Sequence, residues 1–193
     1  MWFKRMPLEE WFDTYQYRTR FDVGESAVKY AAFGDLGLDL ASVPLRYGHH
    51  RGHPELRALV SAEYDRLSPE QVIVTSGAAE AIFAIAASLV EPGDEVVVEH
   101  PNYPSTYEVP RGLGCQVRLL QLELAHAFEP DLDRLAALVT PRTKLLVFTH
   151  PNNPTGSMIS PAELERLVSF AEDRRIHLLF DETYRHLADG PPL

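Results

Sequence analysis

Cysteine is nearly absent from this sequence, which holds a single one, Cys115, in 193 residues. One cysteine cannot close a disulfide within the chain, a situation typical of proteins from reducing compartments. Cys115 stands just before a mostly apolar segment, QVRLL. We interpret it as a small buried hydrophobic residue rather than a catalytic thiol.

Positive charge is also scarce, since 18 Lys and Arg residues against 28 Asp and Glu give a formal net charge of −10. This charge would repel a phosphate backbone, and no stripe of basic residues offsets it, so we expect no nucleic-acid partner. No apolar run approaches the about 20 residues of a membrane-spanning helix. The first residues, MWFKRMPLEEW, lack the apolar core of a signal peptide. We therefore expect a cytoplasmic protein with no membrane partner.

Nucleotide-binding glycine motifs and metal-ligand patterns are missing as well. The segment TSGAAEA (75–81) matches neither the P-loop, which needs a lysine, nor the GxGxxG fingerprint. His49, His50 and His53 have no nearby Cys or carboxylate at ligand spacing, which favours a solvated loop. We predict no metal ion, and we rank a plain nucleotide-binding sheet low.

From residue 71 onward the sequence alternates short, β-branched apolar runs with helical segments. The predicted strands are 71–76, 95–101, 116–122, 144–151 and 176–184, and the predicted helices between them are 77–90, 105–113, 132–139 and 160–175. This alternation is typical of a parallel sheet with crossover helices. We predict an α/β fold over 71–193, a mostly parallel sheet with helices on both faces. Residues 1–70, with a helix over 54–67, are interpreted as an N-terminal arm and small-domain segment.

Polar segments follow the predicted strands: TSGAAEA, EHPNYPS, HPNNPTG and DETY. Open parallel sheets bind ligands beyond the carboxyl ends of their strands, so these segments can form one site. At the start of a helix, the amides of Gly77, Ala78 and Ala79 can bind a phosphate or a carboxylate. A tight strand-to-helix turn without any ligand explains the same residues equally well.

The other strand-end residues carry similar alternatives. Tyr103, between two prolines, offers a flat ring for stacking, or it packs over the edge of the core. Asp181 follows the apolar run HLLF, where a carboxylate needs a cation or a ring N–H, although a lone Asp is more often a cap or an ion-pair partner. Asn152 and Asn153, held between prolines, can donate a hydrogen bond to an oxyanion, but they are also usual turn residues.

Four segments in this order on an alternating α/β chain resemble the class I/II aminotransferases, which are pyridoxal phosphate enzymes of fold type I. The segments are SGAAEA, PNYP, NNPTG and DETY. The distance from Asn153 to Asp181 suits one strand-helix-strand crossover. Upstream, YGHHRGHPELRALV is similar to a Tyr-Gly, Gly and Leu-Arg stretch of that family. The resemblance extends from about Pro7 to the end of the sequence.

This resemblance implies that the cofactor is pyridoxal 5′-phosphate and that most of the polar segments hold it. The backbone of Gly77, Ala78 and Ala79 would bind the cofactor phosphate. Tyr47 resembles a tyrosine that reaches the phosphate of the neighbouring subunit. A homodimer with shared sites is therefore implied.

The resemblance also assigns the contacts to the cofactor ring. Tyr103 would stack on the ring, and Asn153 and Tyr184 would hydrogen-bond its phenolic oxygen. Asp181 would pair with the protonated ring nitrogen and keep the ring cationic, so that it draws electrons from the substrate. Gly24, in FDVGES, matches loosely the place where the family receives the substrate carboxylate.

The sequence contains few lysines, and this bears directly on the reaction that the resemblance implies. The family's reaction needs a lysine that forms a Schiff base with the cofactor and then moves a proton. That lysine follows the DExY strand, whereas the lysines of this sequence are Lys4, Lys29 and Lys144. We therefore expect an incomplete large domain without a catalytic residue, poorly soluble because of an unpaired sheet edge and inactive in isolation.

Several functions remain open for the full-length protein. The first expectation is an aminotransferase that exchanges an amino group between an amino acid and a 2-oxo acid. PLEEWF, FDVGESAVKY and FGDL also resemble capreomycidine synthase-like enzymes, so cyclisation, or another pyridoxal phosphate reaction such as that of a lyase, is an alternative. A further alternative is a non-catalytic fragment that binds the cofactor or only a partner subunit.

Overall fold

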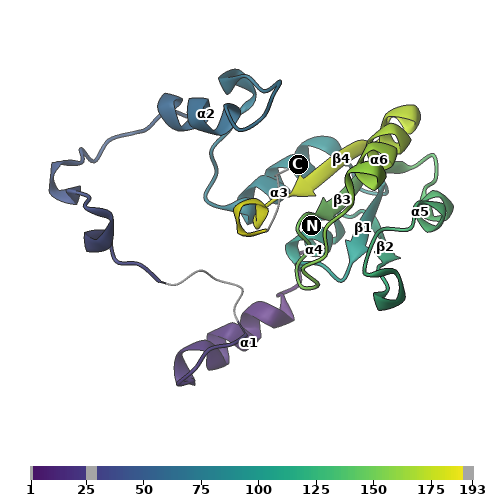
Figure 1. Ribbon diagram of the computed structural model, residues 1–193, viewed down its shortest axis with the longest axis horizontal. Coiled ribbons are helices and arrows are strands. Elements are labelled where there is room, and N and C mark those ends of the chain that lie inside the picture. The colour runs from purple at the N-terminus through teal and green to yellow at the C-terminus, as the bar shows by residue number, and fades with distance from the viewer. Residues whose placement is uncertain (1, 25–29, 189–193) are drawn as a thin grey trace. The chain divides into compact units, whose positions relative to one another are not determined.

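The computed structural model describes residues 2–24 and 30–188 of the chain (Figure 1). These residues divide into two compact units, one made of the N-terminal residues up to Glu10 together with the chain from Ser76 onward, and the other made of Trp11–Thr75. Within the described residues, no helix combines the length and the apolar character needed to cross a bilayer.

The first unit is built on a four-stranded, fully parallel sheet with the strand order β2-β1-β3-β4. Its strands are β1 (Glu95–His100), β2 (Gln116–Gln121), β3 (Thr143–Thr149) and β4 (His177–Asp181). Its helices are α3 (Ala78–Leu89), α4 (Ser105–Gly112), α5 (Leu132–Leu138) and α6 (Pro161–Arg174). The predicted α/β class with a parallel sheet is confirmed.

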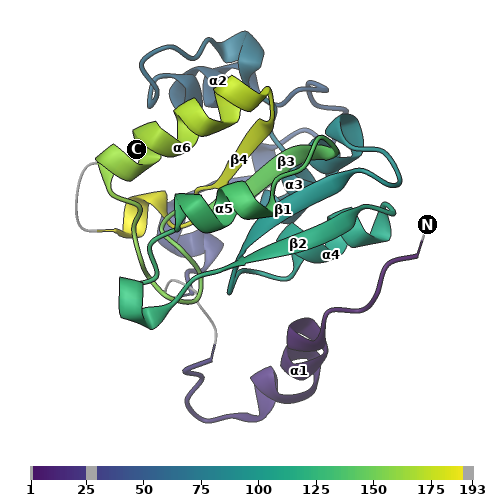
Figure 2. The same ribbon diagram turned by 90° about the vertical axis from the view of Figure 1, so that its right-hand side faces the viewer.

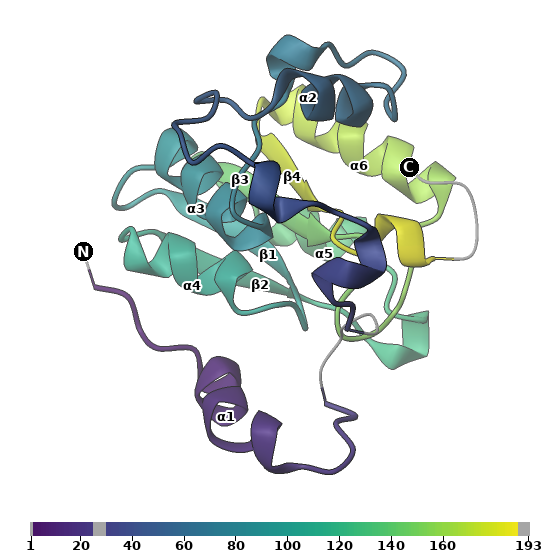
Figure 3. The ribbon, with the colours of Figure 1, turned by 90° about the vertical axis from the view of Figure 1, so that its left-hand side faces the viewer.

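Helices cover both faces of this sheet, with α5 and α6 on one face and α3 and α4 on the other (Figures 2 and 3). Successive strand residues point to opposite faces, so each strand supplies both cores. In β1, Val96 and Val98 pack with Ile82 of α3, while Val97 packs in the cluster that contains Leu135 of α5. The predicted helices on both faces are therefore confirmed. The predicted burial of Cys115 is also confirmed, since it lies in the core between the sheet and helices α3 and α4.

Local sequence signals place the helix ends. The Ser160 hydroxyl accepts a hydrogen bond from the backbone N–H of Glu163, and Pro161 takes the first position of α6. Arg175, in the left-handed conformation, ends that helix. The Asp131 carboxylate caps α5 in the same way, through the amides of Asp133 and Arg134. Both starts follow the preference for short polar side chains at the N-cap.

Two predicted elements differ from the structure: the first strand predicted for the sheet, 71–76, and the helix of the N-terminal segment. Residues 71–76 form no strand. The backbone N–H of Val74 donates a hydrogen bond to the carbonyl of Arg51, and the Ile73 side chain is exposed. A short apolar run needs a pairing partner along its length to form a strand, and this segment has none among the described residues. The helix predicted over 54–67 is shorter, since α2 spans Pro54–Ser61.

The remaining helical elements are short. Helix α1 spans Pro7–Tyr15. Turns of 3₁₀ helix occur at Gln16–Arg18, Phe33–Leu36, Leu40–Ser42, Pro69–Gln71, Leu124–His126 and Arg185–Leu187. None of these elements joins the sheet.

Candidate functional site

The carboxyl ends of β1, β3 and β4 lie along one edge of the sheet, because all three strands are parallel. The register pairs Val98 with Val147 and Thr149 with Asp181. The backbone N–H of His150 donates to the carbonyl of Asp181 at 2.9 Å, which ties the start of one strand-end loop to the next. The segments EHPNYPS, HPNNPTG and DETY therefore leave the sheet at one common edge, as predicted from their positions.

The start of helix α3 lies beside the end of β4. Ala78 and Asp181 line the same hollow of about 270 Å³, together with Ile82 and other apolar residues of α3 and β4. Gly77 precedes the helix with φ +92°, a backbone conformation that favours glycine. The segment TSGAAEA thus also reaches the edge where Asp181 lies.

Asn153, Tyr184 and Tyr103 form one cluster at this edge. The Nδ2 atom of Asn153 lies 3.4 Å from the hydroxyl of Tyr184. Burial raises the pKa of Tyr103 to about 12, with further contributions from a hydrogen bond to Glu9 and from the neighbouring Tyr184. The Tyr103 phenol therefore keeps its proton at neutral pH, and its hydroxyl donates a hydrogen bond to the Glu9 carboxylate.

Asp181 closes a turn with part of its side chain. Its Oδ1 atom accepts hydrogen bonds from the backbone N–H of Thr183 at 3.0 Å and from the Thr183 hydroxyl at 2.6 Å. Among the residues that the structure describes, no Lys or Arg forms an ion pair with this carboxylate. The structural ion pair considered from the sequence is therefore not found there.

Gly24 and Tyr47 belong to the second unit, so their part in a site stays a prediction. The Gly24 N–H donates to the Asp22 carboxylate at 2.9 Å. The Tyr47 side chain is fully exposed, at 100%. Residues 25–29 of the segment FDVGESAVKY, Lys29 included, lie outside the described residues.

The sequence interpretation missed Glu99, which lies beneath the cluster in β1 and is 1% exposed. Its Oε1 atom accepts hydrogen bonds from the Thr149 N–H at 2.5 Å, from Asn152 Nδ2 at 2.9 Å and from Asn102 Nδ2 at 3.3 Å. Burial raises its pKa to about 7, against the lowering effect of the bonds from Thr149 and Asn152. The sequence did carry a signal for this residue, because Glu99 stands in the apolar run EVVVEHP. A carboxylate buried in a strand is costly unless it is hydrogen-bonded, so its position indicates polar partners nearby.

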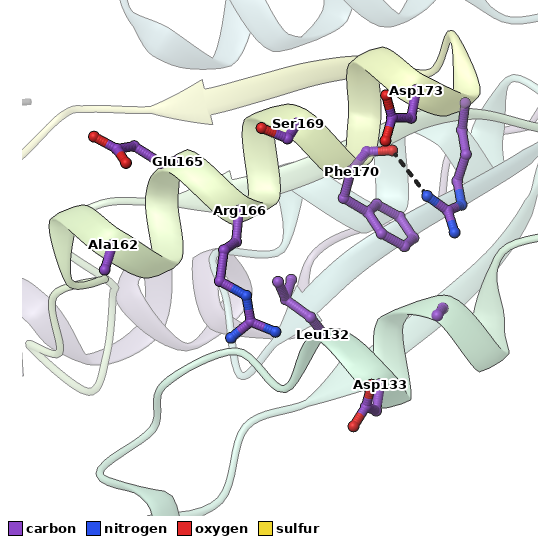
Figure 4. A pocket seen from close by; sticks show the side chains of 10 residues that line it. Leu132, Asp133, Ala162, Glu165, Arg166, Ser169, Phe170 and Asp173 are labelled. Carbon is purple, nitrogen blue, oxygen red and sulfur yellow. Dashed lines mark hydrogen bonds between the residues drawn. The ribbon is translucent and has the colours of Figure 1, made fainter.

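A larger hollow, of about 700 Å³, lies between α5 and α6 (Figure 4). Its lining mixes apolar and charged residues such as Leu132, Phe170 and Arg166. None of its residues comes from a strand-end segment, so we do not regard it as the candidate site.

These features define an α/β protein with a candidate ligand site at the carboxyl edge of a parallel sheet. The profile of the family aminotransferase class I and II matches residues 19–193. The chain belongs to this family. The resemblance to the class I/II aminotransferases, a family whose cofactor is pyridoxal phosphate, is confirmed.

Known relatives agree in sequence and in structure. The chain is 37% identical over 153 residues to the aspartate/prephenate aminotransferase of Thermus thermophilus, covering 77% of this chain and 40% of the relative. It is 35% identical over 198 residues to capreomycidine synthase of Streptomyces vinaceus, covering 97% and 51%. The structure superposes on a PLP-dependent aminotransferase from Streptococcus suis with a TM-score of 0.87 at 32% identity, covering 94% and 52%. The chain thus spans about half the length of these relatives, or less.

Proposed function

We propose that the full-length protein is a pyridoxal phosphate-dependent aminotransferase that moves an amino group between an amino acid and a 2-oxo acid. The observation that carries this proposal is the cluster of Asn153, Tyr184 and Tyr103 at the carboxyl edge of the sheet. Family membership supports the reaction class, and the cluster supports this edge as the place that would hold a flat, polar ring.

The donor set at this edge fits the cofactor. The first amides of α3 have no acceptor inside the helix, so those of Ala78 and Ala79 suit a phosphate, and the positive φ of Gly77 sets the backbone that leads into them. Asn153 and Tyr184 supply an amide and a hydroxyl close together, both able to donate to the phenolic oxygen of the ring.

Asp181 and Tyr103 would hold the ring itself. When bound, the cofactor draws electrons from the α-carbon of the substrate, an effect that a protonated ring nitrogen strengthens. A half-buried carboxylate at Asp181 suits that nitrogen, because it favours the proton there. Tyr103, neutral at physiological pH, offers its flat face without adding charge to the site.

Among the described residues of the four strand-end segments there is no lysine that could supply the family's lysine chemistry. Lys144 is exposed at the amino end of β3, at the opposite edge of the sheet from the cluster. We therefore propose that the 193 residues alone bind the cofactor but do not transfer amino groups. Assay of the isolated chain with amino acid and 2-oxo acid pairs would contradict this if transfer were detected.

We also propose a cytoplasmic homodimer with shared sites. The fully exposed ring of Tyr47 supports a role outside its own unit. Sedimentation of the full-length protein measures its oligomeric state. In a mixture of Tyr47→Phe subunits with subunits that carry Asp181→Ala, a shared site predicts cofactor affinities that differ from those of either parent.

Binding experiments test the cofactor site directly. We expect the isolated chain to bind pyridoxal phosphate, followed by the absorbance and fluorescence of the ring, and not to bind a dinucleotide. Asp181→Ala should weaken the binding at least about tenfold, because an ionic hydrogen bond to the ring is lost.

Asp133→Ala is the matched control, since Asp133 is an exposed aspartate of α5. It should leave the affinity unchanged. Equal binding of the dinucleotide, or an Asp181→Ala variant with the affinity of the wild type, would refute the proposed site.

Cyclisation is a second candidate reaction. It is favoured by the similarity to capreomycidine synthase, which extends over 97% of this chain, whereas the similarity to the Thermus thermophilus aminotransferase covers 77%. Product analysis with the full-length protein separates the two, since amino transfer yields a new 2-oxo acid and cyclisation does not.

A further inference from the structure

Glu99 is the buried group from which the hydrogen bonds of two strand-end loops branch. It stands one residue before the end of β1. One of its oxygen atoms, Oε1, accepts hydrogen bonds from Thr149 at the end of β3, from Asn102 in the first loop and from Asn152 in the second. Residues of two neighbouring strands and of both loops therefore meet at a single acceptor.

The first branch leads to Tyr103. The amide of Asn102 donates to Glu99, and its Oδ1 accepts the backbone N–H of Tyr103 at 2.7 Å. The same Oδ1 accepts the Thr149 hydroxyl at 2.8 Å, so Asn102 is held from both strands. The backbone of Tyr103 is thus one hydrogen bond away from a side chain that Glu99 orients.

The second branch leads to the loop of Asn153. Asn152 donates from Nδ2 to Glu99 and also to the Pro101 carbonyl, at 3.2 Å. Its Oδ1 accepts the hydroxyl of Thr155 at 2.7 Å and its backbone carbonyl accepts the N–H of Gly156 at 2.9 Å. Asn152 thereby closes the turn that presents its neighbour Asn153 and ties that turn to the first loop.

We infer that Glu99 is a positioning residue: through Asn102 and Asn152, its carboxyl oxygen holds the loops 101–104 and 150–157 together and so sets the places of Tyr103 and Asn153 at the site. The significance of these two places rests on the proposed cofactor site. Buried polar groups are costly unless paired. Removing the shared acceptor takes away the partner of the Thr149 N–H and of the Asn102 amide, leaves the Asn152 amide only its bond to the Pro101 carbonyl, and so loosens both loops.

The same strand carries a matched control at its other end. Glu95 is 0% exposed and, like Glu99, accepts several hydrogen bonds, but its partners are Arg118, Arg142 and Thr140. None of these residues belongs to the two loops. A variant at Glu95 perturbs a buried glutamate of β1 without cutting the connection to the site.

Two variants of Glu99 separate its hydrogen-bonding role from its volume. Glu99→Met keeps an unbranched side chain of similar length but removes the carboxyl acceptor, and Glu99→Gln keeps a carbonyl acceptor without the charge. The first measurement is amide hydrogen exchange on the full chain without cofactor, compared between the two loops and helix α3. The second is the affinity for pyridoxal phosphate and the circular dichroism that the bound ring acquires.

For Glu99→Met we expect exchange in 101–104 and 150–157 to rise at least about tenfold with α3 unchanged, and the Kd for pyridoxal phosphate to rise at least about tenfold with loss of the ring signal. Glu99→Gln should restore the exchange and the affinity to within about threefold of the wild type. Glu95→Gln should change neither. This pattern would establish the positioning role.

The inference is overturned if Glu99→Met leaves the exchange of both loops unchanged, raises it equally in α3, or binds the cofactor like the wild type. It is also overturned if Glu99→Gln behaves like Glu99→Met. If the wild type binds no pyridoxal phosphate, the proposed function fails, and the exchange comparison alone decides the role of Glu99.

Should Glu99→Met not fold, Asn102→Ala and Asn152→Ala cut one branch each. Asn102→Ala is then expected to loosen 101–104 more than 150–157. Asn152→Ala should loosen 150–157 and also weaken the hold on 101–104, because Asn152 donates to the Pro101 carbonyl as well. Equal loosening of both loops by Asn102→Ala, or unchanged exchange in 150–157 for Asn152→Ala, would refute the branched connection.

Discussion

Ionisation of Glu99 should make the stability of the first unit depend on pH. Burial raises the pKa of this carboxyl from its ordinary 4.5 to about 7. A group whose pKa is raised by folding stabilises the fold fully below its unfolded pKa, and this contribution is lost as the pH rises through the folded value. The stabilising contribution of Glu99 should therefore disappear between about pH 4.5 and pH 7, and Glu99→Gln, which cannot ionise, should not show this loss.

The size of this effect follows from the two pKa values. Each unit of difference corresponds to about 1.36 kcal/mol, so the shift from 4.5 to about 7 amounts to about 3 kcal/mol in order of magnitude. Solvent screening does not reduce it much, because Glu99 is 1% exposed. The free energy of unfolding of the wild type, relative to Glu99→Gln, should fall by about this amount between pH 4.5 and pH 8.

Urea unfolding of both proteins, in small pH steps across that range, measures the difference. Glu95→Gln is the control, since hydrogen bonds from Arg118, and then from Arg142, lower the pKa of Glu95 to about 2. The contribution of Glu95 is therefore present above its ordinary pKa and is lost only as the pH falls toward 2, so its difference curve should be flat from about pH 5 to pH 8. Parallel curves for the wild type and Glu99→Gln over the whole range would refute the reasoning.

Two further variants test the packing and the capping of the first unit. Leu135→Ala leaves a cavity at a fully buried position between α5 and the sheet and should lower the free energy of unfolding by about 2–5 kcal/mol. Leu124→Ala, at a residue that is 77% exposed, should change it by less than about 0.5 kcal/mol. Equal effects of the two variants in urea unfolding would contradict the assigned core. Ser160→Ala removes the N-cap of α6 and should cost about 1 kcal/mol, while Ser160→Asp should keep most of the stability, and an Ala variant as stable as the wild type in thermal unfolding would show that the cap contributes nothing.

Much of the first unit could be predicted because its signals are local. The β-branched run at 95–100 and the pair Ser160-Pro161 are read from neighbouring residues, and both elements form as expected. The meeting of the strand-end segments at one edge also followed from the sequence, since parallel strands bring their carboxyl ends together; the ligand site at that edge stays a prediction. The segment 71–76 shows the limit of this reasoning. Its apolar residues match a strand, but a strand also needs a partner, and none of the described strands pairs with it.

The sequence by itself therefore determined which segments after residue 76 become helices and strands, where α6 begins, and which polar residues follow the strands, since each depends on residues a few positions apart. Only the tertiary structure decided the strand order β2-β1-β3-β4, the approach of Asn153 to Tyr184, and the role of Glu99 as a shared acceptor. Glu99 meets Thr149 across 50 positions and Asn152 across 53. These two hydrogen bonds form because β1 and β3 pair in one register, which brings the donors within about 3 Å of their acceptor.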